Sequence, residues 1–267
     1  MNTPRYAIGA LAALVCAAGA QALEPFAVYD RFEEKPLDAK RWVETERSRL
    51  VRNGGLHLMQ RTPGVAAGDA GLSFSNWNAS LPSALPVTAI RARIRVDAVE
   101  PASCAANVSP GQSRARIIGS FFNVGTPTEG SQVGDVIAQV RITRFSNTTD
   151  APGLMRVQGI ASVCTSADCA LAQTIGNVVD LGTVMVGTPA VVQLQWDAAG
   201  KAFFFSRDGG ALAGSVGYAQ SDALPPTVPF HQLSTRLDLP SCSSGPLASG
   251  MVDARFDNVA VNRSALP

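Results

Sequence analysis

The side chains that could carry acid–base chemistry are few in this sequence. Glu44-Thr-Glu46 offers one carboxylate pair, because a spacing of two residues places both side chains on the same face of a strand. Retaining glycoside hydrolysis uses two carboxyl groups about 5 Å apart. Arg47 and Arg49 follow directly, and they favour an ion-paired surface strand instead. Glu44 and Glu46 are the catalytic candidates, with surface pairing as the simpler alternative.

The two histidines supply no clear partner for such chemistry. His57 alternates with Leu56 and Leu58, which predicts a place on the solvent side of a strand. His231 lies far from it in the sequence and has no companion motif. The sequence contains no serine-hydrolase elbow, no metal-binding histidine pair and no phosphate-binding glycine loop. These observations favour a protein that binds without catalysis.

Arginines are the residues best suited to bind a ligand. Arg91, Arg93 and Arg95 share one face of an alternating segment, and Arg141 and Arg156 occupy outward positions in two other segments. If these strands are neighbours, the guanidinium groups form a basic stripe suited to carboxylate or sulfate groups. The alternative is an outer strand face that arginines merely solvate, interleaved with Asp and Glu. We predict ligand binding by Arg91, Arg93, Arg95 and Arg141.

Trp77 is the aromatic residue that most resembles a sugar-binding platform. It is out of phase with Leu72 and Phe74, and it is flanked by Asn76 and Asn78. A ring that is out of phase with apolar neighbours is predicted to face solvent, where it can stack on a sugar. Trp77 is therefore predicted to be exposed and to contact the ligand.

The first 22 residues have the features of a signal peptide. Arg5 leads into an apolar run from Ala7 to Ala18, and Ala20-Gln-Ala22 places small residues at the cleavage positions. We expect cleavage near Ala22 and a secreted or periplasmic protein. The apolar run is shorter than the roughly 20 residues of a membrane span. The remaining residues 23–267 are expected to form a single domain.

Removal of this segment leaves four of the five cysteines. Disulfides persist in an oxidising compartment, and the short loop between Cys164 and Cys169 favours a local bridge, which leaves Cys104 to pair with Cys242. The alternative is a zinc site with four thiolates, whose usual paired spacing is tighter. We predict two disulfides.

Composition and periodicity set the framework for these side chains. The chain has 267 residues, 46% of them hydrophobic, and 22 Lys and Arg against 21 Asp and Glu, which argues against nucleic acid as a partner. Ala89–Asp97 alternates strictly between apolar and charged residues, as a half-buried strand does. Similar runs, separated by turn residues, predict strands at Arg114–Val124, Val136–Phe145, Leu154–Cys164, Val178–Val186, Val191–Asp197, Ala202–Arg207 and Met251–Asn262. About a dozen strands predict an all-β sandwich or barrel.

Both ends of the chain resemble a known superfamily. Val28-Tyr-Asp-Arg-Phe32, Arg41-Trp42 and Gly55-Leu-His-Leu58 stand near the beginning, and Ala254-Arg-Phe-Asp-Asn-Val-Ala-Val-Asn262 stands near the end. These segments resemble the first and last strands of secreted concanavalin A-like lectin/glucanase sandwiches, which include laminin-G-like domains. The resemblance implies an antiparallel jelly-roll β-sandwich in which the N- and C-terminal strands are adjacent.

The resemblance also bears on function. The Glu-x-Asp-x-x-Glu motif of the hydrolases in this superfamily is absent, and Gln139-Val-Arg141 has arginine where the Gln-[Ile/Val]-His motif of jelly-roll alginate lyases has its histidine. An acidic residue of the last strand helps to hold a structural calcium in many members. Asp257 matches that residue, and Asp30 could lie beside it. The resemblance therefore implies a possible calcium site and requires no other cofactor.

Together these observations predict a carbohydrate-binding or surface-interaction module. Its expected partner is a polysaccharide or glycoconjugate, including an anionic one, with neither nucleic acid nor a transmembrane segment involved. One alternative is a polysaccharide hydrolase or lyase with an atypical site. Another alternative is a structural protein of the envelope or matrix that binds no sugar.

Overall fold

A computed structural model describes residues 46–125, 127–243, 247 and 249–265. All of them belong to the unit Pro36–Pro267. The predicted signal peptide, the opening segment and the two acidic residues Asp30 and Glu44 lie outside the described residues. In the part of the chain that is described, no helix is long and apolar enough to cross a membrane.

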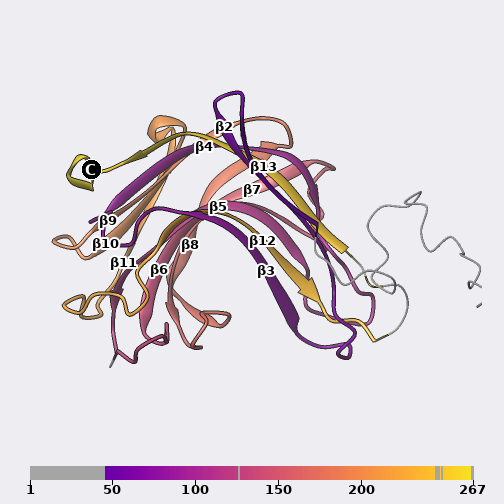
Figure 1. The fold of residues 1–267 in the computed structure, drawn as a ribbon, viewed down its shortest axis with the longest axis horizontal. Coiled ribbons are helices and arrows are strands. Elements are labelled where there is room, and N and C mark those ends of the chain that lie inside the picture. Colours follow the sequence, from indigo (N-terminus) through magenta and orange to yellow (C-terminus); the bar gives the residue numbers. More distant parts are fainter. Residues whose placement is uncertain (1–45, 126, 244–246, 248, 266–267) are drawn as a thin grey trace, which may run out of the picture. The chain divides into compact units, whose positions relative to one another are not determined.

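The described chain is built from antiparallel strands, with two short 3-10 turns, η1 and η2 (Figure 1). Their bounds are β1 Glu46–Arg52, β2 Gly55–Pro63, β3 Leu72–Ser80, β4 Ala89–Glu100, β5 Gln112–Asn123, β6 Asp135–Phe145, β7 Leu154–Cys164, β8 Ala172–Met185, β9 Ala190–Asp197, β10 Ala202–Arg207, η1 Asp208–Gly210, β11 Leu212–Gly217, β12 His231–Pro240, β13 Ser249–Val261 and η2 Arg263–Ala265.

The strands form two sheets. Seven strands pair in the order β1-β2-β13-β4-β9-β10-β11, and six pair in the order β3-β12-β5-β6-β7-β8. Strands distant in sequence are neighbours in both sheets, since β13 pairs with β2 and β4, and β12 pairs with β3 and β5. This arrangement confirms the predicted β-sandwich, and it places the last strand in the interior of one sheet.

The core lies between the sheets and follows the alternation seen in the sequence. In β4, Ile90, Ala92, Ile94 and Val96 are at most 2% exposed, because their side chains point toward the opposite sheet. Phenylalanines such as Phe122 are also fully buried there. The half-buried strand predicted over Ala89–Asp97 is therefore confirmed and extends to Glu100.

The β1–β2 hairpin shows how turn residues set strand register. Asn53 and Gly54 both have positive φ, at 50° and 70°. A two-residue hairpin turn of this kind requires that conformation at both central positions, and Asn-Gly adopts it at low cost. Arg52 consequently pairs with Gly55 at the end of the ladder.

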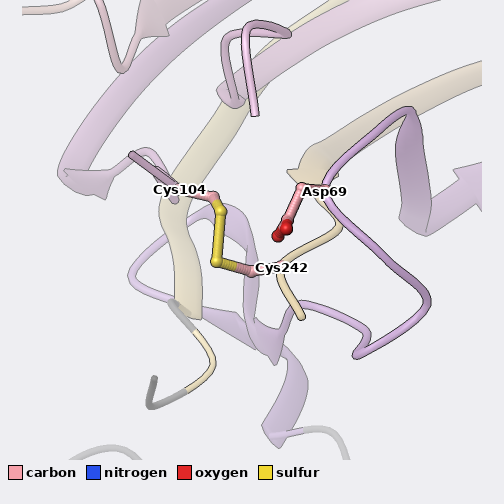
Figure 2. A group of neighbouring side chains, drawn as sticks. All are labelled: Asp69, Cys104 and Cys242. Carbon is pink, nitrogen blue, oxygen red and sulfur yellow. A yellow bond between two sulfur atoms is a disulfide. The ribbon is translucent and has the colours of Figure 1, made fainter. Parts of the chain in front are cut away.

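Both predicted disulfides are present. Cys164 is bonded to Cys169 and Cys104 to Cys242, with sequence separations of 5 and 138 residues. Figure 2 shows the longer-range bridge beside Asp69, whose carboxylate accepts hydrogen bonds from the backbone and hydroxyl of Ser243. Because the four sulfurs are bonded in pairs, they are not available as the thiolate ligands of the zinc alternative.

Candidate functional site

The outer face of the six-stranded sheet carries a group of arginines. In β5, Ala115 and Ile117 point into the sandwich and are fully buried, so Arg114 and Arg116 point to the opposite face. The same alternation in β6 directs Arg141 outward, between the buried Val140 and Ile142. The alternating pattern of the sequence thus positions guanidinium groups on the side of this sheet that does not face the core.

Strand pairing brings these side chains together. Arg116 lies opposite Arg141 in the β5–β6 ladder, and Arg114 lies opposite Arg236 in the β5–β12 ladder. Directly opposed residues have their Cβ atoms about 5 Å apart. Arg114, Arg116, Arg141 and Arg236 therefore form one group on three neighbouring strands, which we call the arginine cluster.

Asp238 is the carboxylate that pairs with this cluster among the described residues. Arg114 Nη2 donates to both of its oxygens, at 2.9 and 2.7 Å, and Arg236 Nε donates to Oδ1 at 2.7 Å. The Arg114 and Asp238 side chains are only 6% and 5% exposed. One buried negative charge is thus shared between two guanidinium groups.

Neutral amides hold the other two arginines. Arg116 donates to Gln139 Oε1 and Asn76 Oδ1, both at 3.1 Å, and Arg141 donates from two nitrogens to Gln158 Oε1, at 3.1 and 2.8 Å. Neither arginine has a carboxylate partner in the described part of the chain. Four guanidinium groups against one carboxylate give the cluster a formal charge of +3.

The electrostatics reflect this imbalance. Burial lowers the pKa of Arg114 to about 10 and that of Arg141 to about 9. Burial, and then the charge of Arg114, holds the pKa of Arg116 well below its ordinary value. Burial by itself would raise the pKa of Asp238, but the surrounding arginines outweigh it and lower that pKa. With pKa values well above 7, Arg114 and Arg141 are charged at neutral pH, and they outnumber the one carboxylate, Asp238.

Such an excess is costly in a folded protein unless an anion offsets it. A buried charge without a partner destabilises the fold by several kcal/mol in typical cases. The planar guanidinium group presents paired donors that match the two oxygens of a carboxylate or sulfate. The arrangement is therefore chemically suited to hold an anionic group from outside the chain.

A cleft of about 520 Å³ opens beside the cluster. Arg116 and Arg236 line one part of it, together with the side chains of Asn76, Asn78 and Gln232. The Asn78 Oδ1 atom is buried and has no hydrogen-bond partner in the described structure.

The described lining of this cleft lacks an acid–base pair. It contains no histidine, tyrosine or lysine, and Asp168 is its one carboxylate. Hydrolysis of a sugar chain needs two carboxyl groups, and proton abstraction needs a base within hydrogen-bond reach. The described lining therefore offers guanidinium donors for an anion.

His231 is the first residue of β12 in this sheet, and its ring points to the inner side, away from the cleft. It is 7% exposed, and its ring packs edge-on against the core residue Phe121 at 5.3 Å between ring centroids. The close approach of the ring to Gly119 leaves no room for a Cβ atom there. Burial lowers the pKa of His231 to about 4, so the ring is neutral in the folded protein at neutral pH.

This histidine should make the fold sensitive to acid. Because the folded-state pKa is about 4 and the unfolded value is 6.5, the unfolded chain binds the proton first. The contribution of the neutral His231 ring to the free energy of unfolding is therefore fully present above pH 6.5. It is lost as the pH drops toward 4, by about 3 kcal/mol in total. Urea unfolding at a series of pH values should show this loss. His231→Phe should remove it, and His57→Gln, the matched control, should retain it.

The predicted stripe joining Arg91, Arg93 and Arg95 to Arg141 is wrong. The first three lie on β4 of the seven-stranded sheet, whereas Arg141 lies on β6 of the other sheet. The prediction assumed that these strands were neighbours, but β4 pairs with β13 and β9.

The outer face of β4 instead mixes both signs of charge. Arg95 Nε lies 2.5 Å from Asp97, and Arg93 lies 3.9 Å from Asp257. This matches the simpler alternative of a solvated face with interleaved acidic residues. Arg141 is the one residue of the predicted set that lies in the arginine cluster.

The prediction that Trp77 is exposed is also wrong. The prediction assumed that Leu72 and Phe74 point into the core, so that Trp77, on the other face of the strand, would face solvent. Instead, Phe74 is 36% exposed, and the Arg236 guanidinium lies 4.3 Å over its ring. Trp77 points to the inner side, packs against the core and donates from Nε1 to the Ser48 carbonyl at 2.9 Å. The Arg49 guanidinium covers its ring at 4.5 Å.

The remaining predicted site residues are dispersed. Glu46 begins β1, 4.0 Å from Arg61, and its predicted partner Glu44 is not among the described residues. Asp257 lies 3.9 Å from Arg93 and 3.8 Å from Arg255, and Asp30 is outside the described residues. Two cationic neighbours do not favour a metal ion at Asp257. The calcium site stays a prediction.

Comparisons with known proteins return matches among solved structures. No family model and no curated protein sequence matches the chain. Among solved structures, alginate lyase A1-II′ of polysaccharide lyase family 7 covers 85% of this chain and 88% of its own, with 12% identity and a TM-score of 0.46. The legume lectin-like domain from Entamoeba histolytica covers 87% and 98%, with 10% identity and a TM-score of 0.34. The carbohydrate recognition domain of Emp46p covers 80% and 88%, with 8% identity and a TM-score of 0.35.

These three structural likenesses are weak. All three identities are low and all three TM-scores are below 0.5, so no residue role and no ligand are transferred from these structures to this chain. The chain is an antiparallel β-sandwich of two sheets, with an arginine cluster on the outer face of its six-stranded sheet.

Proposed function

We propose that the protein binds an acidic polysaccharide without cleaving it, with the carboxylate or sulfate groups of the sugar held by the arginine cluster. The observation that carries this proposal is that, in the described structure, Arg116 and Arg141 hydrogen-bond to neutral groups, while the Asp238 carboxylate pairs with Arg114 and Arg236. A bound anion would complete this site, because it offsets the excess positive charge.

The geometry of the sheet suits an extended ligand. The outward residues of β12, β5 and β6 form successive rows, which repeat about every 7 Å along each strand. Arg114 and Arg236 lie in one row, and Arg116 and Arg141 lie in the next. A polymer with one negative charge on each sugar could therefore place successive charges on different arginines, which favours a polymer over a single free anion.

The two disulfides fit an extracellular or periplasmic protein, because such bonds persist in oxidising compartments. The proposed site of action is therefore outside the cytoplasm, where acidic polysaccharides of envelopes and matrices are accessible. Export through the predicted signal peptide is part of this proposal.

Binding to a soluble polyuronate and to a neutral glucan of similar length tests the proposal by calorimetry. We expect the polyuronate to bind and the glucan not to bind. Salt should weaken binding about three- to tenfold between 50 and 300 mM NaCl, since the attraction to surface charges is screened. Reducing ends and unsaturated products should stay at background.

Each other outcome has a defined meaning. Release of unsaturated product would establish the lyase alternative, and release of reducing ends alone would establish hydrolysis. Absence of binding to any polysaccharide would favour the structural envelope or matrix protein. Equal affinity for the neutral glucan would contradict the role of the arginine cluster.

A further inference from the structure

The cleft beside the arginine cluster has an apolar end. Ile118 and Ile137 line it together with Val228, Phe230 and Cys169. Ile118, Ile137 and Cys164 form a small hydrophobic cluster separate from the main core, with Cys169 and Phe230 packed against it. This apolar cluster lies on the outer face of the six-stranded sheet, where it borders the cleft and does not contribute to the core between the sheets.

This apolar end adjoins the charged end directly. Ile118 follows Arg116 by two residues in β5, so both side chains lie on the same face about 7 Å apart. Gln232 of β12 lies opposite Ile118, and it lines the cleft as Gln132 does. The amides of Gln132 and Gln232 can donate hydrogen bonds to a carbonyl oxygen in this part of the cleft.

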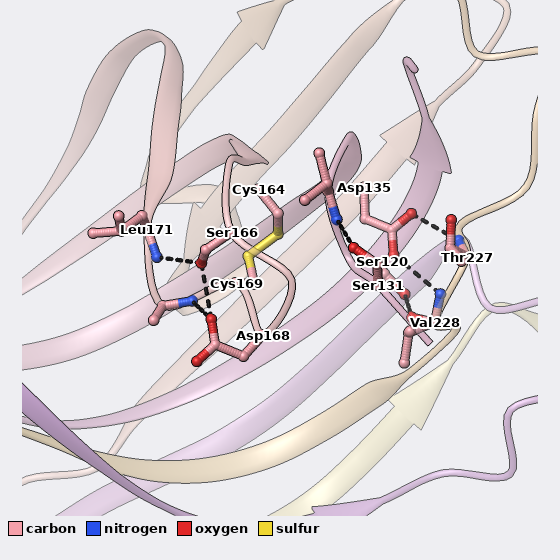
Figure 3. The surroundings of a disulfide bond; sticks show 12 residues. Ser120, Ser131, Asp135, Cys164, Ser166, Asp168, Cys169, Leu171, Thr227 and Val228 are labelled. Atoms are coloured by element: carbon pink, nitrogen blue, oxygen red, sulfur yellow. Dashed lines mark hydrogen bonds between the residues drawn. A yellow bond between two sulfur atoms is a disulfide. The ribbon is translucent and has the colours of Figure 1, made fainter. Parts of the chain in front are cut away.

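The walls around the apolar end are fixed by bonds between separate loops. The Cys164–Cys169 disulfide closes one loop, and Gln132 N donates to the carbonyl of Ala167 within it at 2.8 Å. Figure 3 shows this loop and, beside it, the Asp135 carboxylate, which binds the segment of Thr227 and Val228 on another side of the cleft. Asp135 accepts from Thr227 N at 2.7 Å and from Val228 N at 3.0 Å.

Phe230 is anchored to the sheet in the same way. Its backbone nitrogen donates to Ser120 Oγ at 2.9 Å, and its carbonyl accepts from Ser120 N at 2.9 Å. The phenyl ring is therefore held at the cleft by bonds that do not involve the ring itself. A preformed apolar site costs little ordering entropy when it binds.

From this juxtaposition we propose that the cleft selects acidic sugars that carry an acetyl group. The anionic group lies at Arg116 and Arg236, and the acetyl methyl lies at the apolar end formed by Ile118, Ile137 and Phe230. This inference rests on the proposed binding of acidic polysaccharide, and it specifies which members of that class bind best. The acetyl can belong to an ester on a uronate or to an amide on an amino sugar.

A matched pair of polymers tests the inference. An O-acetylated polymannuronate and the same preparation after alkaline removal of its acetyl groups are compared by calorimetry, with hyaluronan as a third ligand that carries its acetyl on an amide. We expect one or both acetylated ligands to bind about tenfold tighter than the deacetylated polymer, which is the usual scale for one small apolar group in a pocket.

Variants separate this site from the charged end. Phe230→Ser, and independently Val228→Ser, should reduce the affinity ratio between acetylated and deacetylated polymer toward one. Phe204→Ser is the matched control, because Phe204 is an exposed phenylalanine on β10 of the other sheet. It should leave the ratio at the value of the unmodified protein.

The outcomes distinguish the two proposals. Tighter binding of the ester-bearing polymer assigns the acetyl to a uronate, and tighter binding of hyaluronan alone assigns it to an amino sugar. Equal binding of all three polymers, or a ratio unchanged in both wall variants, overturns the acetyl site while leaving the proposed function intact. No binding of any of them overturns the proposed function itself.

Discussion

Replacing Arg116 with glutamine should lower the affinity for a polyuronate about 10- to 100-fold. Arg116 is 5% exposed, lines the cleft and has no carboxylate partner in the described structure. Hydrogen bonds to charged groups contribute about 1.5 to 3 kcal/mol, which corresponds to this range. Calorimetric titration at constant salt measures the change.

The same substitution should not destabilise the free protein. Arg116 is surrounded by Arg114, Arg141 and Arg236, and its removal relieves repulsion within a buried group of like charges. We therefore expect the free energy of unfolding of Arg116→Gln to equal or exceed that of the unmodified protein. Weaker binding together with undiminished stability is the signature of a residue retained for a ligand and not for the fold.

Arg93→Gln is the matched control for this experiment. Arg93 lies on the outer face of the seven-stranded sheet, 3.9 Å from Asp257, and it is 45% exposed at its side chain. The control removes the same charge from the chain, so any effect of net charge alone would appear in both variants. An equal loss of affinity in Arg93→Gln would contradict binding at the arginine cluster.

Of the two disulfides, Cys104–Cys242 should contribute more to the free energy of unfolding, so its loss should destabilise the protein more. Its sequence separation of 138 residues corresponds to about 5 kcal/mol of stabilisation in the chain-entropy model, against about 2 kcal/mol for the five-residue separation of Cys164–Cys169. The paired change Cys104→Ser with Cys242→Ser should lower Tm by about 10 to 20 °C.

The position of this disulfide is a second reason to expect a large loss of stability when it is removed. Cys104 precedes β5 and Cys242 follows β12, the two strands that carry three of the four clustered arginines. Differential scanning calorimetry compares this double variant with a second double variant, Cys164→Ser/Cys169→Ser. Each of the two lacks one disulfide. The prediction is contradicted if the two pairs lower Tm equally.

Much of the fold was predictable because alternation marks a strand with one buried and one solvated face. β4 was recognised in this way, and β7 and β10 were bounded correctly. β12 was not recognised as a strand. Its polar residues Ser234 and Asp238 are as buried as its leucines, so the contrast between the two faces is lost.

The site was less predictable because it depends on which strands are neighbours. The spacing of Arg114 and Arg116 in an alternating run could have identified them as outward residues. Their proximity to Arg236 depends on the β5–β12 pairing, which joins residues more than a hundred positions apart. The predicted stripe from Arg91, Arg93 and Arg95 to Arg141 was wrong for the same reason, since local spacing does not determine the partner strand.

The interior position of β13 has a consequence for biosynthesis. The last strand completes the seven-stranded sheet between β2 and β4, and β12 completes the other sheet between β3 and β5. Neither sheet can be completed until β12 and β13 have been synthesised. Contacts between strands this distant in sequence also form slowly. Hairpins of neighbouring strands, such as β5–β6 and β9–β10, can form earlier, but neither sheet is complete before β12 and β13 have emerged. For a chain exported as predicted, that delay would keep it competent for translocation until the compartment that oxidises its cysteines is reached.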